Sequence, residues 1–273
     1  MSEVLDRCGI FSWFGFRLPL SERIRLIKEA GFSSTSVWLG EEEELVKSGK
    51  ECLIPEIVRS HGLFFENVHA PYNHCNNIWS DSGSTRSVIK NEYDSSISFC
   101  SKHGIPIVVV HISRGDDAPK PNEHGLDVIR KIIKRAEDAN VTVAIENTGK
   151  PCYLDHIFSN VESPFLGLCY DSSHDFLGHS NPGTLLREWG HLLVATHLSD
   201  NDGISDRHWV PGEGNIDWEV VRDCFPKDTY TGSFTLEVLP KADGGQPVRS
   251  FLRKAIESLS WTRSLLMREQ CSD

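Results

Sequence analysis

Residues 192–218, LLVATHLSDNDGISDRHWVPGEGNIDW, join an apolar strand to a dense group of polar side chains. The apolar run 192–196 ends at His197, and the loop after it carries Asp200, Asp202, Asp206 and His208. The rigid turn 211–214, PGEG, and a helix start near Asp217 follow. An apolar strand that stops abruptly at imidazoles and carboxylates is typical of a metal or catalytic site at a strand end.

Short apolar runs alternate with amphipathic segments along the whole chain. The runs predict strands, buried and apolar on both faces, at 8–13, 32–39, 63–68, 106–110, 141–145, 165–170, 192–196 and 233–236. Helices are expected at 20–27, 54–61, 89–100, 126–136, 153–158, 182–189, from about 217, and at 248–259, with an acidic segment at 41–44. Eight strand–helix units in 273 residues predict an α/β fold, a single (β/α)8 TIM barrel.

The chain has no composition break, Gly/Ser linker or internal repeat, so we expect one domain over residues 1–273. A doubly wound sheet is the competing architecture. It would not bring the ends of strands three to eight around one centre, whereas a closed barrel does.

The overall charge of the chain indicates which kinds of binding partner to expect. A net charge of -11 and the lack of a Lys/Arg cluster argue against a nucleic-acid or anionic-membrane partner. No stretch is apolar enough for a membrane span, and the first residues, MSEVLDRCGIF, do not resemble a signal peptide. The eight cysteines are irregularly spaced without a C-x-x-C pair, which favours reduced thiols and a cytoplasmic protein.

Six consecutive predicted strands end in a residue that could bind a metal: His69, His111, Glu146, Asp171, His197 and Glu237. A barrel gathers these ends on one rim, and His174, Asp206 and His208 lie in loops over the same rim. Carboxylates and imidazoles together suit Zn, Mn, Co or Fe(II). Any one of these residues could simply be a polar group leaving the core, and a rim of hydrogen-bonded charges is the alternative. Six in succession favour a metal site, because the converging carboxylates need positive charge between them.

Several motifs give a more specific resemblance. They are VAIEN at 143–147, CYDSSH at 169–174, HLSDN at 197–201, RHWVPGEGNIDW at 207–218 and TLEV at 235–238, supported by VHAPY at 68–72 and VVH at 109–111. With these motifs the chain resembles the xylose-isomerase-like TIM-barrel superfamily over essentially its whole length. That superfamily includes sugar and sugar-phosphate isomerases and epimerases as well as endonuclease IV.

The resemblance to the epimerase branch implies one divalent metal (Mn, Zn, Co or Mg) held by Glu146, Asp171, His197 and Glu237. It also implies that Glu146 and Glu237 act as acid and base on opposite faces of a keto-sugar, through a metal-stabilised enediolate. His174 would then bind a substrate hydroxyl. Some epimerases have a substrate-binding Arg where this chain has His208, and the adjacent Arg207 is the residue expected to bind the substrate instead.

Two tryptophans, Trp13 and Trp38, are expected at the ends of the first two strands. They could pack on the sugar, or they could simply fill the barrel mouth.

The resemblance to endonuclease IV implies a different centre, with two or three Zn ions. By that match His69 and His111 would hold one ion with Glu146, the four residues of the epimerase site would hold a second, and His174, Asp206 and His208 would hold a third. Such a cluster cleaves phosphodiesters.

The acidic balance favours the first alternative, a metal-dependent sugar or sugar-phosphate isomerase or epimerase. A DNA-repair enzyme should present many phosphate-binding cations, whereas the rim loops offer chiefly Arg17, Arg114, Lys120, Lys150 and Arg207 among many acids. The expected partner is thus a small sugar or sugar phosphate. A non-catalytic sugar-binding barrel is a third alternative. A homo-oligomer is compatible with such a barrel.

Overall fold

The computed structural model describes residues 7–40, 42–178, 183–241 and 245–268. Eight parallel strands form one sheet in the order β7-β6-β5-β4-β3-β2-β1-β8. The strands are β1 (Cys8–Phe11), β2 (Ser34–Trp38), β3 (Phe64–His69), β4 (Ile107–Val110), β5 (Thr142–Glu146), β6 (Leu166–Asp171), β7 (Leu193–His197) and β8 (Phe234–Leu236). Leu198 closes the ring, since its N–H donates to the Thr235 carbonyl at 2.8 Å and its carbonyl accepts from the Glu237 N–H at 3.1 Å.

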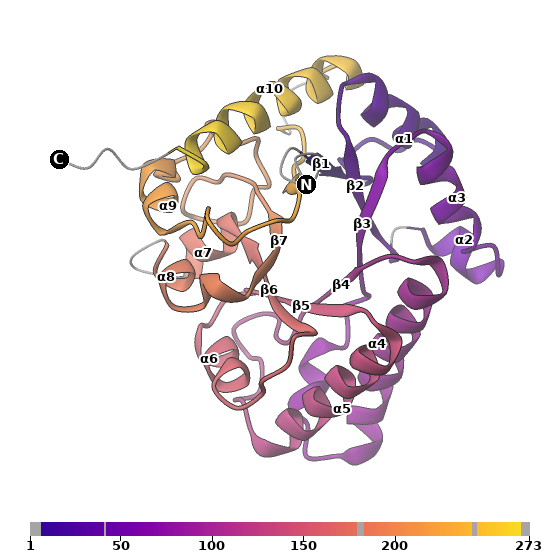
Figure 1. Ribbon diagram of the computed structural model, residues 1–273, viewed down its shortest axis with the longest axis vertical. Coiled ribbons are helices and arrows are strands. Elements are labelled where there is room, and N and C mark those ends of the chain that lie inside the picture. Colours follow the sequence, from indigo (N-terminus) through magenta and orange to yellow (C-terminus); the bar gives the residue numbers. More distant parts are fainter. Residues whose placement is uncertain (1–6, 41, 179–182, 242–244, 269–273) are drawn as a thin grey trace.

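The closed ring confirms the predicted (β/α)8 barrel and excludes the doubly wound sheet. Figure 1 shows the helices arranged around the outside of the strands. They are α1 (Leu20–Glu29), α2 (Glu43–Lys47), α3 (Leu53–Ser60), α4 (Gly83–His103), α5 (Glu123–Ala139), α6 (Cys152–Phe158), α7 (Ser172–Gly178), α8 (Thr184–Trp189), α9 (Trp218–Cys224) and α10 (Val248–Leu266). Two 3-10 turns are η1 (Cys75–Trp79) and η2 (Gly190–Leu192). Among the described residues, none of the helices could cross a membrane.

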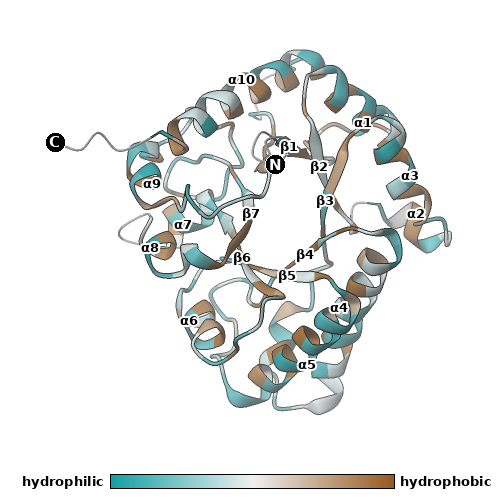
Figure 2. Cartoon of the chain, viewed as in Figure 1, coloured by the Kyte–Doolittle hydropathy of each residue, from teal (hydrophilic) through white to brown (hydrophobic). Residues whose placement is uncertain are grey.

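The helices form where apolar residues recur at helical spacing. In α5 the side chains of Leu126, Ile129 and Ile133 are buried against the barrel, while the opposite face is charged. The Asn122 side chain caps the helix by accepting the N–H of Gly125 at 3.0 Å. Figure 2 shows the resulting pattern, with several hydrophobic strands, a paler β2, and helices that alternate between hydrophobic and hydrophilic stripes.

The structure departs from the predicted elements in several places. The first strand ends at Phe11 rather than at residue 13, and η1 lies in a segment expected to be a loop. Helix α7 begins immediately after β6, where a loop was expected, because the Asp171 carboxylate accepts the N–H of His174 at 2.7 Å and so starts the first turn. Of the expected helical segments, Pro182 and Glu41 lie outside the described residues.

The interior near the strand starts is polar, which corrects the expectation of strands apolar on both faces. Ser34, Thr35 and Ser36 of β2 are buried, and so is Glu66 of β3, at 2% exposure. The Glu66 carboxylate crosses the barrel and accepts the Ser233 N–H at 2.5 Å and the Thr235 hydroxyl at 2.9 Å. The Thr35 hydroxyl donates to the Ile10 carbonyl at 2.7 Å, which satisfies this buried polar group. Burial raises the pKa of Glu66, more than the hydrogen bonds from Ser233 and Thr235 lower it.

Replacing Glu66 tests this interior contact. Glu66→Ala leaves the buried Ser233 N–H without its acceptor, so the free energy of unfolding should fall by about 1–3 kcal/mol. Glu66→Gln keeps an acceptor and removes the ionisable group. Because the folded-state pKa is raised, wild type should lose stability relative to Glu66→Gln as pH rises through that pKa, measured by urea unfolding at a series of pH values. A difference that does not vary with pH would contradict this account.

Candidate functional site

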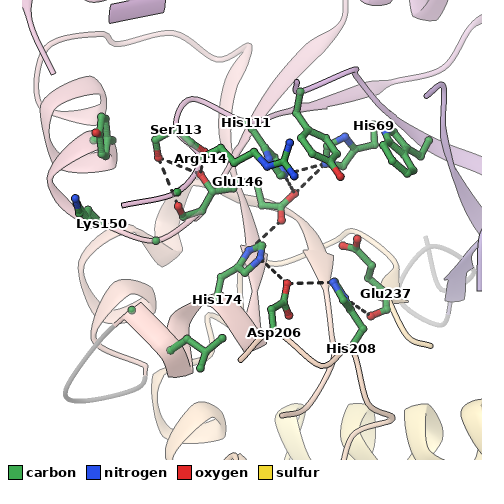
Figure 3. Close-up of a pocket in the computed structure, with 18 of the residues that line it drawn as sticks. His69, His111, Ser113, Arg114, Glu146, Lys150, His174, Asp206, His208 and Glu237 are labelled. Carbon is green, nitrogen blue, oxygen red and sulfur yellow. Dashed lines mark hydrogen bonds and ion pairs between the residues drawn. The ribbon is translucent and has the colours of Figure 1, made fainter. Parts of the chain in front are cut away.

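A cavity of about 950 Å³ opens at the carboxyl ends of the strands. This volume is at the upper end of the usual range for small-molecule sites. Figure 3 shows the side chains that line it, and they come from strand ends and from the loops that follow them. The candidate residues at the surface of the cavity include His69, His111, Glu146, His174, Asp206, His208 and Glu237.

The Glu146 carboxylate, at the end of β5, is the centre of the group and is 1% exposed. Its Oε2 atom lies 3.2 Å from Nε2 of His69, 3.2 Å from Nε2 of His111 and 3.0 Å from Nδ1 of His197. Its Oε1 atom lies 3.2 Å from Nδ1 of His174. Residues from β3, β6–α7, β7 and the end of β4 thus meet at one carboxylate.

Two sets of possible metal ligands share Glu146. In each, the possible ligand atoms lie within 4.8 Å of one another. One comprises Glu146, Asp171, His197 and Glu237, and the other comprises His69, His111 and Glu146. A related group contains Cys169 with Glu146 and His197, but burial raises the pKa of the Cys169 thiol to about 12, so this thiol stays protonated.

A third set of predicted residues lies beside these. Asp206 Oδ2 is 3.1 Å from Nε2 of His174 and 3.1 Å from Nε2 of His208. His208 adopts a φ of 50°, in the left-handed region, and its Nδ1 lies 3.1 Å from the Glu237 carbonyl. Backbone strain at a non-glycine residue of a site is tolerated only where surrounding contacts enforce it.

The electrostatics of the site show carboxylates that attract positive charge. Burial opposes ionisation of Glu146, but His197 and His111 outweigh it and hold its pKa well below the usual value. Burial opposes protonation of His197, but the Glu146 and Glu237 carboxylates raise its pKa well above the usual value. Burial, ahead of the opposing attraction of His174, raises the pKa of Asp171 to about 7. Neighbouring carboxylates also outweigh burial at His174 and His208 and raise the pKa of both, whereas burial lowers the pKa of His111. Protons on His174, His197 and His208 therefore offset part of the buried negative charge.

The donor set fits a divalent metal. Asp171 belongs to the four-residue group, and its Oδ2 atom is buried and accepts no hydrogen bond from the residues that the structure describes. An unpartnered buried oxygen among two further carboxylates and an imidazole is suited to a cation such as Zn, Mn or Co. Glu146, Asp171, His197 and Glu237 would hold it.

Comparison with known proteins identifies the family to which this barrel belongs. Residues 24–265 match the family described as xylose isomerase-like TIM barrel. The chain belongs to this family. The family confirms the resemblance seen in the motifs.

An uncharacterized protein of Sinorhizobium fredii is 29% identical to this xylose isomerase-like barrel over 163 residues, or 55% of this chain and 51% of the relative. The chain spans about half the length of the curated relatives it matches. A D-psicose 3-epimerase structure, determined with D-fructose, has a TM-score of 0.77 at 17% identity and covers 96% of this chain and 100% of that one. The apo 3-keto-D-glucoside 4-epimerase of E. coli has a TM-score of 0.72 at 17% identity, covering 94% and 99%. Identities this low show a shared fold.

The residues predicted to touch substrate are not all at the cavity of this family member. Trp13 and Trp38 line it, and Trp38 stacks on Tyr72 with ring centroids 5.3 Å apart. Arg207 does not line it, because its guanidinium pairs with Asp202 at 2.8 Å and is 44% exposed.

Sequence reasoning missed three side chains that position the site. Tyr72 stacks on His111 with centroids 4.5 Å apart, and only the VHAPY motif signalled it. The Asn147 amide clamps Asp171, donating to its carbonyl at 2.8 Å and accepting its N–H at 2.7 Å. The buried Asp200 carboxylate accepts the N–H groups of Gly212 and Ile216 and thereby orders the PGEG turn.

Metal binding should stabilise the protein measurably. At a free Mn²⁺ or Zn²⁺ concentration of about 100 Kd, binding to the folded state adds about 2.7 kcal/mol, which raises Tm by several degrees relative to protein in chelator. Asp171→Asn removes a charged ligand and should abolish most of this gain in differential scanning fluorimetry. Asp138→Asn, the same change on an exposed face of α5, is the control. An equal gain in Asp171→Asn and wild type would count against the four-residue centre.

Proposed function

We propose that this protein is a divalent-metal-dependent sugar isomerase or epimerase. The observation that carries the proposal is the pair of carboxylates, Glu146 and Glu237, which approach one imidazole from different strands. His197 Nδ1 lies 3.0 Å from a Glu146 oxygen and 3.1 Å from a Glu237 oxygen. The solved neighbours of the same fold that are named as sugar epimerases support it.

In this mechanism the two carboxylates move the proton. Burial acts to raise the pKa of both, but His197 and other imidazoles lower it below the usual value, so both groups are ionised at neutral pH. One removes a proton from a substrate carbon and later releases it to solvent, and the other takes up a proton from solvent and gives it to the substrate. The bound metal would supply the positive charge that stabilises negative charge on the substrate oxygens.

Other residues of the cavity would bind and shield the sugar. The His174 ring, linked to Asp206, is placed to bind a substrate hydroxyl. Trp13, Trp38 and Phe11 give the cavity an apolar wall on which a sugar ring can pack and from which water is excluded.

Solvent exchange tests the proposed proton transfer. We expect wild type loaded with Mn²⁺ to incorporate deuterium from D2O at a carbon beside the carbonyl of at least one ketose in a panel, measured by proton NMR. Glu146→Gln and Glu237→Gln should each slow this exchange by at least about 100-fold, because each removes a general base. Glu123→Gln, on the exposed side of α5, is the matched control. Near wild-type exchange in either site variant would refute the two-base mechanism.

A second candidate, a multi-zinc phosphodiesterase of the endonuclease IV kind, is supported by one observation. His69, His111 and Glu146 form an additional ligand group beside the first, more than one metal requires. The negative net charge of the chain and the sugar epimerases that share its fold favour the sugar reaction. The phosphodiesterase is therefore the second choice.

His208→Ala separates the two candidates. If His208 only contacts the substrate, the variant should keep the wild-type metal content per chain and bind the sugar more weakly. If His208 holds a further ion with His174 and Asp206, the variant should lose about one equivalent of zinc. Elemental analysis of both proteins after the same zinc loading measures this, and the first outcome is expected.

A further inference from the structure

The cavity has two electrically different sides. The metal-ligating side carries the carboxylates of Glu146, Asp206 and Glu237. The other side, which we call the cationic lobe, consists of Ser113, Arg114, Gly115, Asp116, Thr148, Gly149 and Lys150, so its two cations share the lining with one acid, Asp116. Figure 3 shows Ser113 and Lys150 on one side of the cavity, Glu237 and His208 on the other, and Arg114 reaching from the Ser113 side toward His111. Among the described residues that line this cavity, Arg114 is the arginine and Lys150 is the lysine.

The two cations of the lobe are held in place by neutral groups. Arg114 Nη1 lies 3.4 Å from the Asn73 side-chain oxygen, and the guanidinium lies 5.2 Å from the Tyr72 ring centroid. Lys150 Nζ donates to the Asp116 carbonyl at 2.7 Å. In the described part of the chain, their polar contacts are thus to an amide and a carbonyl oxygen, not to a carboxylate. Both positive charges remain available to a ligand.

The backbone under the lobe is well ordered by hydrogen bonds. Thr148 Oγ1 donates to the Ser113 carbonyl at 2.8 Å and lies 3.2 Å from Ser113 Oγ, which joins the loops after β4 and β5. Asn76 fixes Arg114, donating to its carbonyl at 2.9 Å and accepting its N–H at 2.8 Å. Gly149, with a φ of 111°, makes the turn that leads to Lys150.

We propose that the cationic lobe binds an anionic group of the substrate, a phosphate or a carboxylate at the end of the sugar away from the metal-ligating groups. This inference rests on the proposed sugar reaction and narrows it to anion-bearing sugars. An arginine fork and a lysine ammonium are the usual protein partners of such oxyanions. A cavity of 950 Å³ leaves room for that group beyond the part of the sugar at Glu146 and Glu237.

The test compares fructose with two sugars that carry an anionic group at its remote end and match it elsewhere: fructose 6-phosphate and fructuronate. Their affinities for metal-loaded protein are measured by titration calorimetry. Wild type should bind at least one of the two anionic sugars about tenfold or more tightly than fructose, as expected for charge-assisted hydrogen bonds. Which anionic sugar is preferred distinguishes phosphate from carboxylate.

The double variant Arg114→Gln/Lys150→Gln should lose that preference and keep its affinity for fructose. The control Arg130→Gln/Lys134→Gln removes the same charge from the outer face of α5 and should keep the preference. No binding of either anionic sugar, an equal affinity of wild type for all three, or a preference that survives in Arg114→Gln/Lys150→Gln would overturn the proposal.

Deuterium exchange on the same sugars separates this proposal from the proposed reaction. Exchange without any anion preference would overturn the cationic lobe and leave the isomerase reaction standing. A lobe-dependent preference with no exchange on any sugar would support the lobe and count against the isomerase reaction.

Discussion

The structure depends on one buried negative charge, the Glu146 carboxylate at the end of β5. It is contacted at 3.0–3.2 Å by imidazoles of four residues that come from different parts of the sequence, namely His69, His111, His174 and His197. A carboxylate at 1% exposure is costly unless opposite charge and hydrogen-bond donors surround it. The barrel supplies these partners by closing, because closure brings strand ends that are distant in sequence around one centre.

Packing around the centre restricts how these groups can move. Phe11 contacts the His197 ring edge-on at a centroid distance of 4.8 Å, and Tyr72 stacks on His111. Asn147 joins β5 to β6 next to Asp171, and Asp200 orders the loop that carries Asp206 and His208. Such supporting contacts hold ligating and proton-transferring groups in place before a substrate arrives.

The sequence predicted the barrel and its rim residues for one physical reason. Parallel strands buried on both sides are short apolar runs, so a His, Asp or Glu at the end of each run marks where the chain leaves the core. Side-chain direction in long loops carries no such signal. Arg207 was therefore expected at the substrate, whereas the structure pairs it with Asp202, outside the cavity. The role of Glu66 could not be predicted from the sequence, because its partners Ser233 and Thr235 lie about 170 residues away. Only closure of the barrel brings them together.

The central claim is that Glu146, Asp171, His197 and Glu237 hold a divalent metal. Anomalous diffraction at the metal absorption edge, from crystals grown with Mn²⁺ or Zn²⁺, tests it most directly. The account predicts a strong peak among these four side chains, at about 2.0–2.3 Å from their oxygen and nitrogen atoms. A cavity with no such peak, in which protonated histidines alone balance the carboxylates, would contradict it.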